Sequence, residues 1–193
     1  MRYGIISISD EREETKGQIR HSFDCDPEPL RCFDISNRAD VMRFINTFPG
    51  FDLNQYNANR KYETIPARHF GEVGCWMSHL GAWSYMVDEK IDRMAVVEDD
   101  ALVTPASVND IIEQSDGYGL YMAGEWAEFY VISLSAAETL VHAAYEYGFK
   151  RMPVDEYMFD MIREGAVTGQ FWTGHIVQAR HFPSNIHMKG IEH

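Results

Sequence analysis

The chain has 193 residues, with 17 Lys and Arg against 30 Asp and Glu, so its formal charge is −13. A chain of this length folds by default as one domain and needs no disulfides. Its acidic balance is the reverse of the clustered positive charge that nucleic-acid binding requires, and no apolar run approaches the roughly 18 residues of a membrane span. Three cysteines at spacings that suit neither disulfides nor zinc, and no signal-peptide-like apolar stretch at the start, indicate a cytoplasmic protein.

Short apolar runs alternate with helical patterns along the chain. Strands are expected over residues 3–8, 30–35, 93–97, 119–123, 128–132 and 170–177, helices over 74–89, 104–114, 135–147 and 153–164, and a long loop or lid over 46–68. The run 93–97 is too apolar for a half-exposed strand, as expected at the centre of a parallel sheet. The alternation predicts an α/β sandwich with a mostly parallel central sheet.

Helix signals support three of these assignments. Apolar residues recur at helical spacing over 74–89, namely Trp76, Leu80, Trp83 and Val87. Thr104 before Pro105 is typical of an N-cap followed by the first helical residue. Ser135, with a glutamate three residues later, fits a capping box and predicts a helix start there.

Three consecutive carboxylates, Glu98, Asp99 and Asp100, follow the apolar run 93–97. Side chains alternate along an extended chain, so Glu98 and Asp100 are expected on one face and Asp99 on the other. The carboxyl end of a central strand is where α/β sheets bind ligands, and oxygen ligands there suit Mg²⁺ or Mn²⁺. The structural alternative is a solvated acidic loop.

A second feature is the stretch 71–79, which reads Gly-Glu-Val-Gly-Cys-Trp-Met-Ser-His. Its glycines allow close backbone approach, and Ser78 and His79 are expected one turn into the helix that follows. His79 alone would more simply be a hydrogen-bonded histidine beside the apolar face. Cys75 is expected to be a small buried residue, because no cationic neighbour in the sequence would activate it as a nucleophile.

Together these motifs resemble glycosyltransferase family 25, which includes lipopolysaccharide and lipooligosaccharide galactosyltransferases and is related to collagen galactosyltransferases. The resemblance rests on Gly71-Glu72-x-Gly74-Cys75-x-x-Ser78-His79, then Trp83, then Val97-Glu98-Asp99-Asp100, with further matches over 130–133, 136–137 and 153–155. It implies a GT-A (Rossmann-like) fold in a single domain. The nucleotide-sugar half would span about residues 1–104 and the acceptor half about residues 105–193.

The resemblance also implies a donor site and a metal site. Asp100 would bind Mn²⁺ (or Mg²⁺) bridging the sugar diphosphate, and Glu98 would contact ribose or metal-bound water. A C-terminal histidine would add a ligand, and His181 ranks before His175 and His187 because it precedes the break at Pro183. The residues expected around the donor are Ser7, Ile8, Ser9, Arg12, Glu72, Ser78, His79, Glu98 and Asp99. For Arg12 the structural alternative is a salt-bridged surface arginine.

The implied reaction is transfer of a hexose, with galactose or glucose first, from a UDP-sugar to a saccharide or glycolipid acceptor in surface glycan or lipopolysaccharide synthesis. Asp155 is expected to be the general base of an inverting transfer or to orient the acceptor, with Glu156 in reserve. An acidic residue in a first helical turn is also stabilised by the helix dipole alone. Two other functions stay open, a non-catalytic nucleotide- or sugar-binding module and a metal-dependent phosphohydrolase.

Overall fold

The structure is a computed structural model that describes residues 1–7, 12–30, 32, 39, 66–124, 126–147, 153–171 and 178–179, without the side chains of residues 66–73 and 178–179. Several predictions therefore lie outside the described residues. These are the loop over 46–65, most of the strands expected at 30–35 and 170–177, and the site residues Ile8, Ser9 and His181.

Strands and helices alternate along the described chain. They are β1 (Arg2–Ile6), α1 (Glu13–Ser22), α4 (Pro66–Asp88), β2 (Arg93–Glu98), β3 (Ala101–Leu102), α5 (Pro105–Gln114), β4 (Leu120–Met122), β5 (Phe129–Ser133), α6 (Leu134–Tyr147), α7 (Val154–Arg163), β6 (Gly169–Phe171) and β7 (Gln178–Ala179). Of the helices in these ranges, none combines the length and the apolar composition needed to cross a bilayer.

The central sheet is mixed rather than mostly parallel in its pairings. Its strand order is β1-β2-β5-β4-β6, and β1 is parallel to β2 as β4 is to β6. Strand β5 runs antiparallel to both β2 and β4. The short connection from β4 to β5 explains this departure, because parallel neighbours need a crossover of a dozen or more residues. A separate two-stranded sheet pairs β3 with β7.

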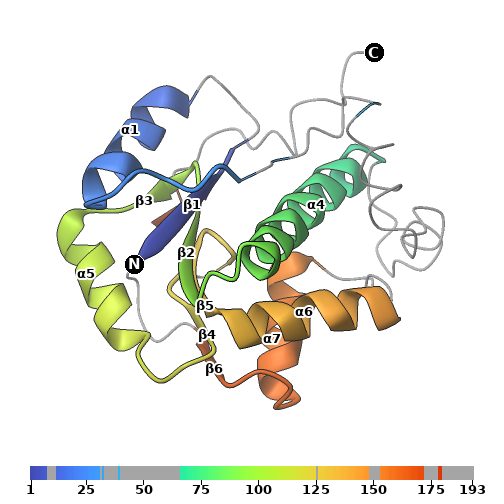
Figure 1. Cartoon of the computed structure of the whole chain (residues 1–193). Coiled ribbons are helices and arrows are strands. Elements are labelled where there is room, and N and C mark those ends of the chain that lie inside the picture. The colour runs from blue at the N-terminus through green and yellow to red at the C-terminus, as the bar shows by residue number, and fades with distance from the viewer. Residues whose placement is uncertain are drawn as a thin grey trace.

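Both faces of the sheet are buried, as the apolar run 93–97 predicts. On β2, Met94 and Val96 pack with α4, α6 and α7 into one core, while Ala95 and Val97 pack with α1 and α5 into the other. Figure 1 shows these two helical layers on opposite sides of the strands. The fold is therefore a three-layer sandwich with the end of β2 at the edge of its middle layer.

Helix α4 is longer than its apolar pattern indicates. It begins at Pro66 rather than at residue 74, and proline is well suited to a first helical turn. The predicted apolar face is confirmed, since Trp76, Leu80 and Trp83 are at most 1% exposed. The stretch 71–74 is itself helical, so Ser78 and His79 lie about three turns into the helix rather than one.

The two predicted helix starts have different outcomes. Thr104 caps α5 as expected, because its side chain accepts a hydrogen bond from the Ser107 N–H and Pro105 follows it. The capping box predicted at Ser135 is wrong. Helix α6 begins at Leu134, directly after β5, and Ser133 Oγ accepts the Ala136 N–H at 3.3 Å, so the last strand residue serves as the cap.

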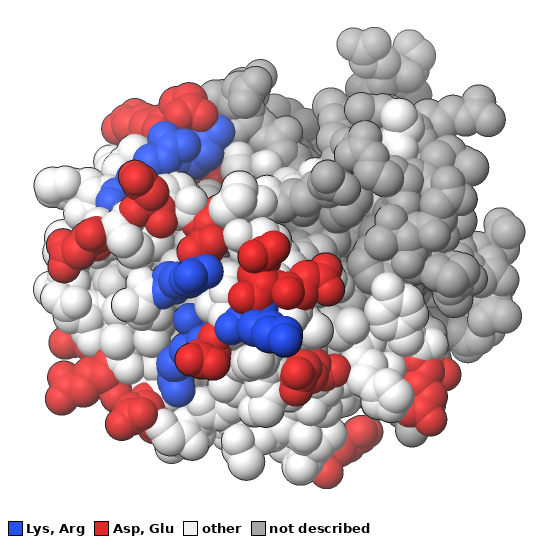
Figure 2. All heavy atoms as spheres, viewed as in Figure 1, with Lys and Arg blue, Asp and Glu red and all other residues white. Residues whose placement is uncertain are grey.

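Charged side chains of both signs intermingle over the face drawn in Figure 2. Pairs on the described surface include Arg2 Nε with Glu28 Oε1 at 3.5 Å and His142 Nε2 with Glu146 Oε2 at 3.2 Å. Such exposed pairs contribute little stability. The cores on the two sheet faces therefore supply most of the folding free energy.

Replacing Leu80 with alanine tests whether α4 anchors the larger core. Leu80 is 1% exposed, and Leu80→Ala is expected to lower the free energy of unfolding by about 2–5 kcal/mol in urea denaturation. The same truncation at the exposed Leu102 is the matched control and should change it by less than about 0.5 kcal/mol. Equal effects of the two variants would contradict this packing.

Candidate functional site

The carboxyl ends of β1 and β2 meet at one edge of the sheet. The Asp99 N–H donates to the Ile6 carbonyl at 3.0 Å, which holds the first residue after β2 against the end of β1. Ser7 follows β1, and its hydroxyl donates to Asp99 Oδ2 at 2.6 Å. The structure thus brings Ser7, a predicted donor-site residue, into contact with the acidic triplet.

Asp99 is fully engaged inside the protein. Its Oδ1 accepts from the Arg12 guanidinium, its Oδ2 accepts from Ser7, and the residue is 5% exposed. The same guanidinium lies 3.5 Å from Asp100 Oδ2. Arg12 is therefore salt-bridged as its structural alternative predicts, but its side chain is 13% exposed rather than on the surface, and its positive charge lies beside the triplet.

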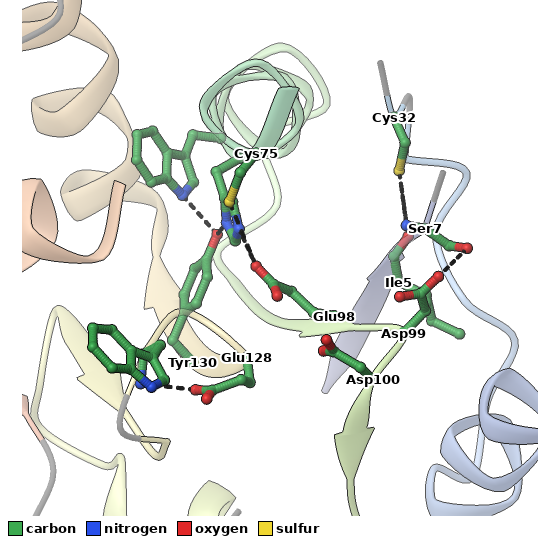
Figure 3. Close-up of polar contacts among 12 residues, drawn as sticks. Ile5, Ser7, Cys32, Cys75, Glu98, Asp99, Asp100, Glu128 and Tyr130 are labelled. Atoms are coloured by element: carbon green, nitrogen blue, oxygen red, sulfur yellow. Dashed lines mark hydrogen bonds and ion pairs between the residues drawn. The ribbon is translucent and has the colours of Figure 1, made fainter. Parts of the chain in front are cut away.

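Glu98 turns away from Asp99, as the alternation along β2 predicts (Figure 3). Its Oε1 lies 2.9 Å from His79 Nε2 and 3.7 Å from Cys75 Sγ, both on α4. Burial is the largest influence on Glu98 and opposes its charged form, but the hydrogen bonds from His79 and Cys75 and the positive charge nearby together outweigh burial and hold the pKa of this carboxyl below its ordinary value. Glu98 is an anion held from the α4 side.

Asp100 has no such support. Burial first, and then the negative charge of Glu98, raise its pKa to about 6. Its Oδ1 is buried and has no hydrogen-bond partner among the described residues. An unpartnered buried carboxylate oxygen is costly, and a bound cation would relieve that cost.

Glu128, which lies directly before β5, is a buried carboxylate at this edge that no sequence motif singled out. Its carbonyl accepts the Glu98 N–H at 2.8 Å, and its side chain, 4% exposed as a residue, accepts the Trp126 N–H at 2.8 Å. Burial first, with smaller contributions from the charges of Glu98 and Asp100, raises the pKa of Glu128 to about 7. A carboxylate directly before an apolar run is visible in the sequence. Its place beside the triplet depends on β5 pairing with β2, and the sequence does not give that strand order.

Asp155 is buried in the first turn of α7, whereas the reserve candidate Glu156 is exposed. The Asp155 carboxylate accepts backbone hydrogen bonds at the helix start, yet Oδ2 is buried and lacks a partner among the described residues. Burial raises the pKa of Asp155, and the charge of Glu98 adds to that shift. Asp155 thus lies within electrostatic range of the acidic triplet.

The remaining predicted donor residues lie on α4. His79 is fully buried with both ring nitrogens bonded to protein groups, and Ser78 is 2% exposed. This burial favours an indirect role for His79, through Glu98, over direct contact with a donor. Glu72 is part of α4, but its side chain lies outside the described part of the chain.

The residues at this edge fit a divalent cation. Glu98 and Asp100 offer carboxylate oxygens, the ligands that Mg²⁺ and Mn²⁺ prefer, and Asp100 Oδ1 has no other described partner. A second group is also compact enough to hold a metal, because Cys75 Sγ, His79 Nε2 and one oxygen of Glu98 lie within 4.8 Å of one another.

Removing the charge of Asp100 should stabilise the metal-free protein. Because the folded-state pKa of Asp100 is raised to about 6, its ionised form costs stability above that pH, and this cost disappears as pH falls toward about 4. In EDTA at about pH 8, Asp100→Asn is expected to raise the free energy of unfolding by about 2–3 kcal/mol, with the gain shrinking on acidification.

The exposed Asp110 on α5 provides the matched control. Asp110→Asn should change the free energy of unfolding by less than about 0.5 kcal/mol at every pH. A gain for Asp100→Asn that is independent of pH, or a loss at about pH 8, would contradict the assigned cost.

Comparisons with known proteins agree with the sequence resemblance. The family profile described as "Glycosyltransferase family 25 (LPS biosynthesis protein)" matches residues 42–129, which contain Cys75, His79 and the acidic triplet. A "Glycosyltransferase 25 family member" from Drosophila pseudoobscura pseudoobscura is 28% identical over 162 residues, covering 70% of this chain and 25% of that protein. "Procollagen galactosyltransferase 2" from Homo sapiens is 28% identical over 120 residues, covering 46% of this chain and 19% of that protein.

This chain thus spans 25% or less of the length of these two relatives. The family profile covers the α4 residues and the acidic triplet at the end of β2. One relative is named as a glycosyltransferase 25 family member, and the other is named as a galactosyltransferase. Over residues 42–129 the chain is therefore similar to glycosyltransferase family 25.

Proposed function

We propose that the chain transfers a hexose from a UDP-sugar to a saccharide or glycolipid acceptor in a metal-dependent, inverting reaction. The observation that carries the proposal is at the end of β2, where Asp100 Oδ1 is buried without a described partner and within electrostatic range of Glu98. The name of the human relative favours galactose, and the description of the family profile favours lipopolysaccharide as the acceptor.

Within this proposal, Glu98 and Asp100 hold the cation, and Asp99 does not. Both Asp99 oxygens are engaged by Ser7 and Arg12, so Asp99 orients the triplet instead. A divalent ion bound here would neutralise the charge that develops on the departing UDP. Arg12, beside Asp100, adds positive charge at the same place.

Asp155 is the proposed general base. It would take the proton of the acceptor hydroxyl as that oxygen attacks the anomeric carbon and the bond to UDP breaks on the opposite side. An unpartnered Oδ2 and a raised pKa support this role, because a base works best when its pKa approaches the working pH. We place the donor in the half before about residue 104 and the acceptor in the half after it.

A thermal-shift panel of nucleotide sugars, with and without Mn²⁺, tests the donor and metal assignments. A ligand at about 100 times its dissociation constant adds about 2.7 kcal/mol, which corresponds to about 5–10 °C for a domain of this size. The expected result is a shift with one UDP-hexose that requires Mn²⁺, persists in Asp110→Asn and is lost in Asp100→Asn.

Three other outcomes would contradict the proposal. Folded protein that no nucleotide sugar stabilises would mean that only the fold of the family is retained. Donor binding without transfer to any glycan of a broad acceptor panel would indicate a binding module. Steady release of inorganic phosphate from simple phosphoesters would indicate a phosphohydrolase.

Two variants, Asp155→Asn and Glu128→Gln, test which of these two buried carboxylates is the general base. Asp155→Asn is expected to lower kcat by about 10²–10⁴-fold, with the Kd for the UDP-sugar changed less than about threefold. Glu128→Gln should lower kcat by less than about tenfold, measured in the same steady-state assay. The reverse ranking would assign proton abstraction to Glu128.

A further inference from the structure

A chain of three hydrogen bonds connects the core beneath α4 to Glu98. Trp83 Nε1 donates to the Tyr130 hydroxyl at 2.9 Å, that hydroxyl lies 2.9 Å from His79 Nδ1, and His79 Nε2 lies 2.9 Å from Glu98 Oε1. Trp83, Tyr130 and His79 are each fully buried. We call this chain the Glu98 relay.

The indole nitrogen sets the direction of the Glu98 relay. An indole N–H can only donate, so the Tyr130 oxygen accepts from Trp83. Tyrosine has one hydroxyl hydrogen, and His79 Nδ1 is the acceptor beside it. His79 therefore has a bare Nδ1 and carries its proton on Nε2, which donates to Glu98.

The other protonation states satisfy fewer groups. A doubly protonated His79 would direct two donors at the Tyr130 oxygen and leave the buried hydroxyl hydrogen with no acceptor within the relay. The Nδ1–H tautomer would turn a bare Nε2 toward the Glu98 carboxylate. Only the neutral Nε2–H tautomer makes every bond of the relay.

The Glu98 relay also decides which oxygen of Glu98 is held. The contacts from His79 and Cys75 both go to Oε1, which faces α4. Asp100 lies on the side of Glu98 that is away from α4 (Figure 3). Neither contact uses Oε2. We propose that Trp83, Tyr130 and His79 are positioning residues that hold Glu98 by Oε1 and present Oε2 to the cation and UDP. The inference rests on the proposed donor site.

The same geometry argues against a metal between Cys75, His79 and Glu98. Their ligand atoms are close enough for one, but His79 would have to give its Nε2 lone pair to the metal, and the relay places a proton there. A thiolate would also be needed, and burial raises the pKa of Cys75 well above its ordinary value. The group is a hydrogen-bonded support of Glu98.

Nitrogen-15 NMR of histidine-labelled protein tests the relay itself, independently of any activity. The His79 signals, assigned by their loss in His79→Gln, are expected to show a protonated Nε2 and a bare Nδ1 at neutral pH. In Tyr130→Phe the Nδ1 signal should shift, because this nitrogen loses its hydrogen-bond donor, while Nε2 keeps its proton toward Glu98. A doubly protonated ring or a protonated Nδ1 in the wild type would overturn the inference, as would a thiolate-to-metal absorption band when Co²⁺ is added.

Calorimetric titration with UDP in the presence of Mn²⁺ tests the positioning role. Loss of a hydrogen bond to a metal-ligating group typically costs 10–100-fold in affinity, so His79→Leu should raise the Kd by about that factor, and Tyr130→Phe, one hydrogen bond farther from Glu98, should raise it by less. Tyr121→Phe is the matched control, since its hydroxyl bonds Gln114 at 2.8 Å and its side chain packs in the other core. That variant should change the Kd by less than about twofold.

A second pair of variants guards against simple loss of packing. A glutamine at position 79 can accept from Tyr130 and donate to Glu98, so His79→Gln should bind UDP more tightly than His79→Leu. Wild-type affinity in both Tyr130→Phe and His79→Leu would overturn the inference. The wild type could instead show the expected tautomer and yet bind neither Mn²⁺ nor UDP. That result would overturn the proposed donor site, and with it this role of the relay.

Discussion

Three adjacent carboxylates at the end of a buried strand repel one another, and most of the site is arranged around that repulsion. Asp99 is neutralised by Arg12 and held by Ser7, whereas Glu98 is held by His79 from the other side of the strand. Asp100 lies farther from the same Arg12 nitrogen, with its Oδ2 at 3.5 Å, and its pKa rises to about 6. The protein thus stabilises two of the three charges internally, and we propose that a cation stabilises the third.

The reversed direction of β5 makes this arrangement possible. Because β5 runs antiparallel to β2, its first residues lie at the edge where β2 ends, and the Glu128 carbonyl accepts the Glu98 N–H. Tyr130, the second residue of β5, pairs with Val96 and lies beneath α4 within reach of His79. The short connection from β4 to β5 therefore places the buried carboxylate of Glu128 at this edge. It also sets the direction of β5, which brings Tyr130 into the Glu98 relay.

Periodicity and caps predicted much of the scaffold from sequence. The apolar run of β2, the buried face of α4 and the Thr104 cap of α5 are all local signals, and the structure confirms them. The start of α4 was not predicted, because polar residues before 74 obscure the helical period. The opposite facing of Glu98 and Asp99 was predictable from strand alternation, whereas the contact of His79 with Tyr130 depends on strand order, which no local pattern encodes.

The central claim is that Asp100 leaves one charge for a divalent cation that UDP shares. Electron paramagnetic resonance of free Mn²⁺ during titration into the protein, with and without UDP, measures this most directly. The account predicts one bound Mn²⁺ per chain whose affinity rises when UDP is present, and loss of that binding in Asp100→Asn but not in Asp110→Asn. Mn²⁺ binding that is absent, or that responds neither to UDP nor to the loss of Asp100, would contradict it.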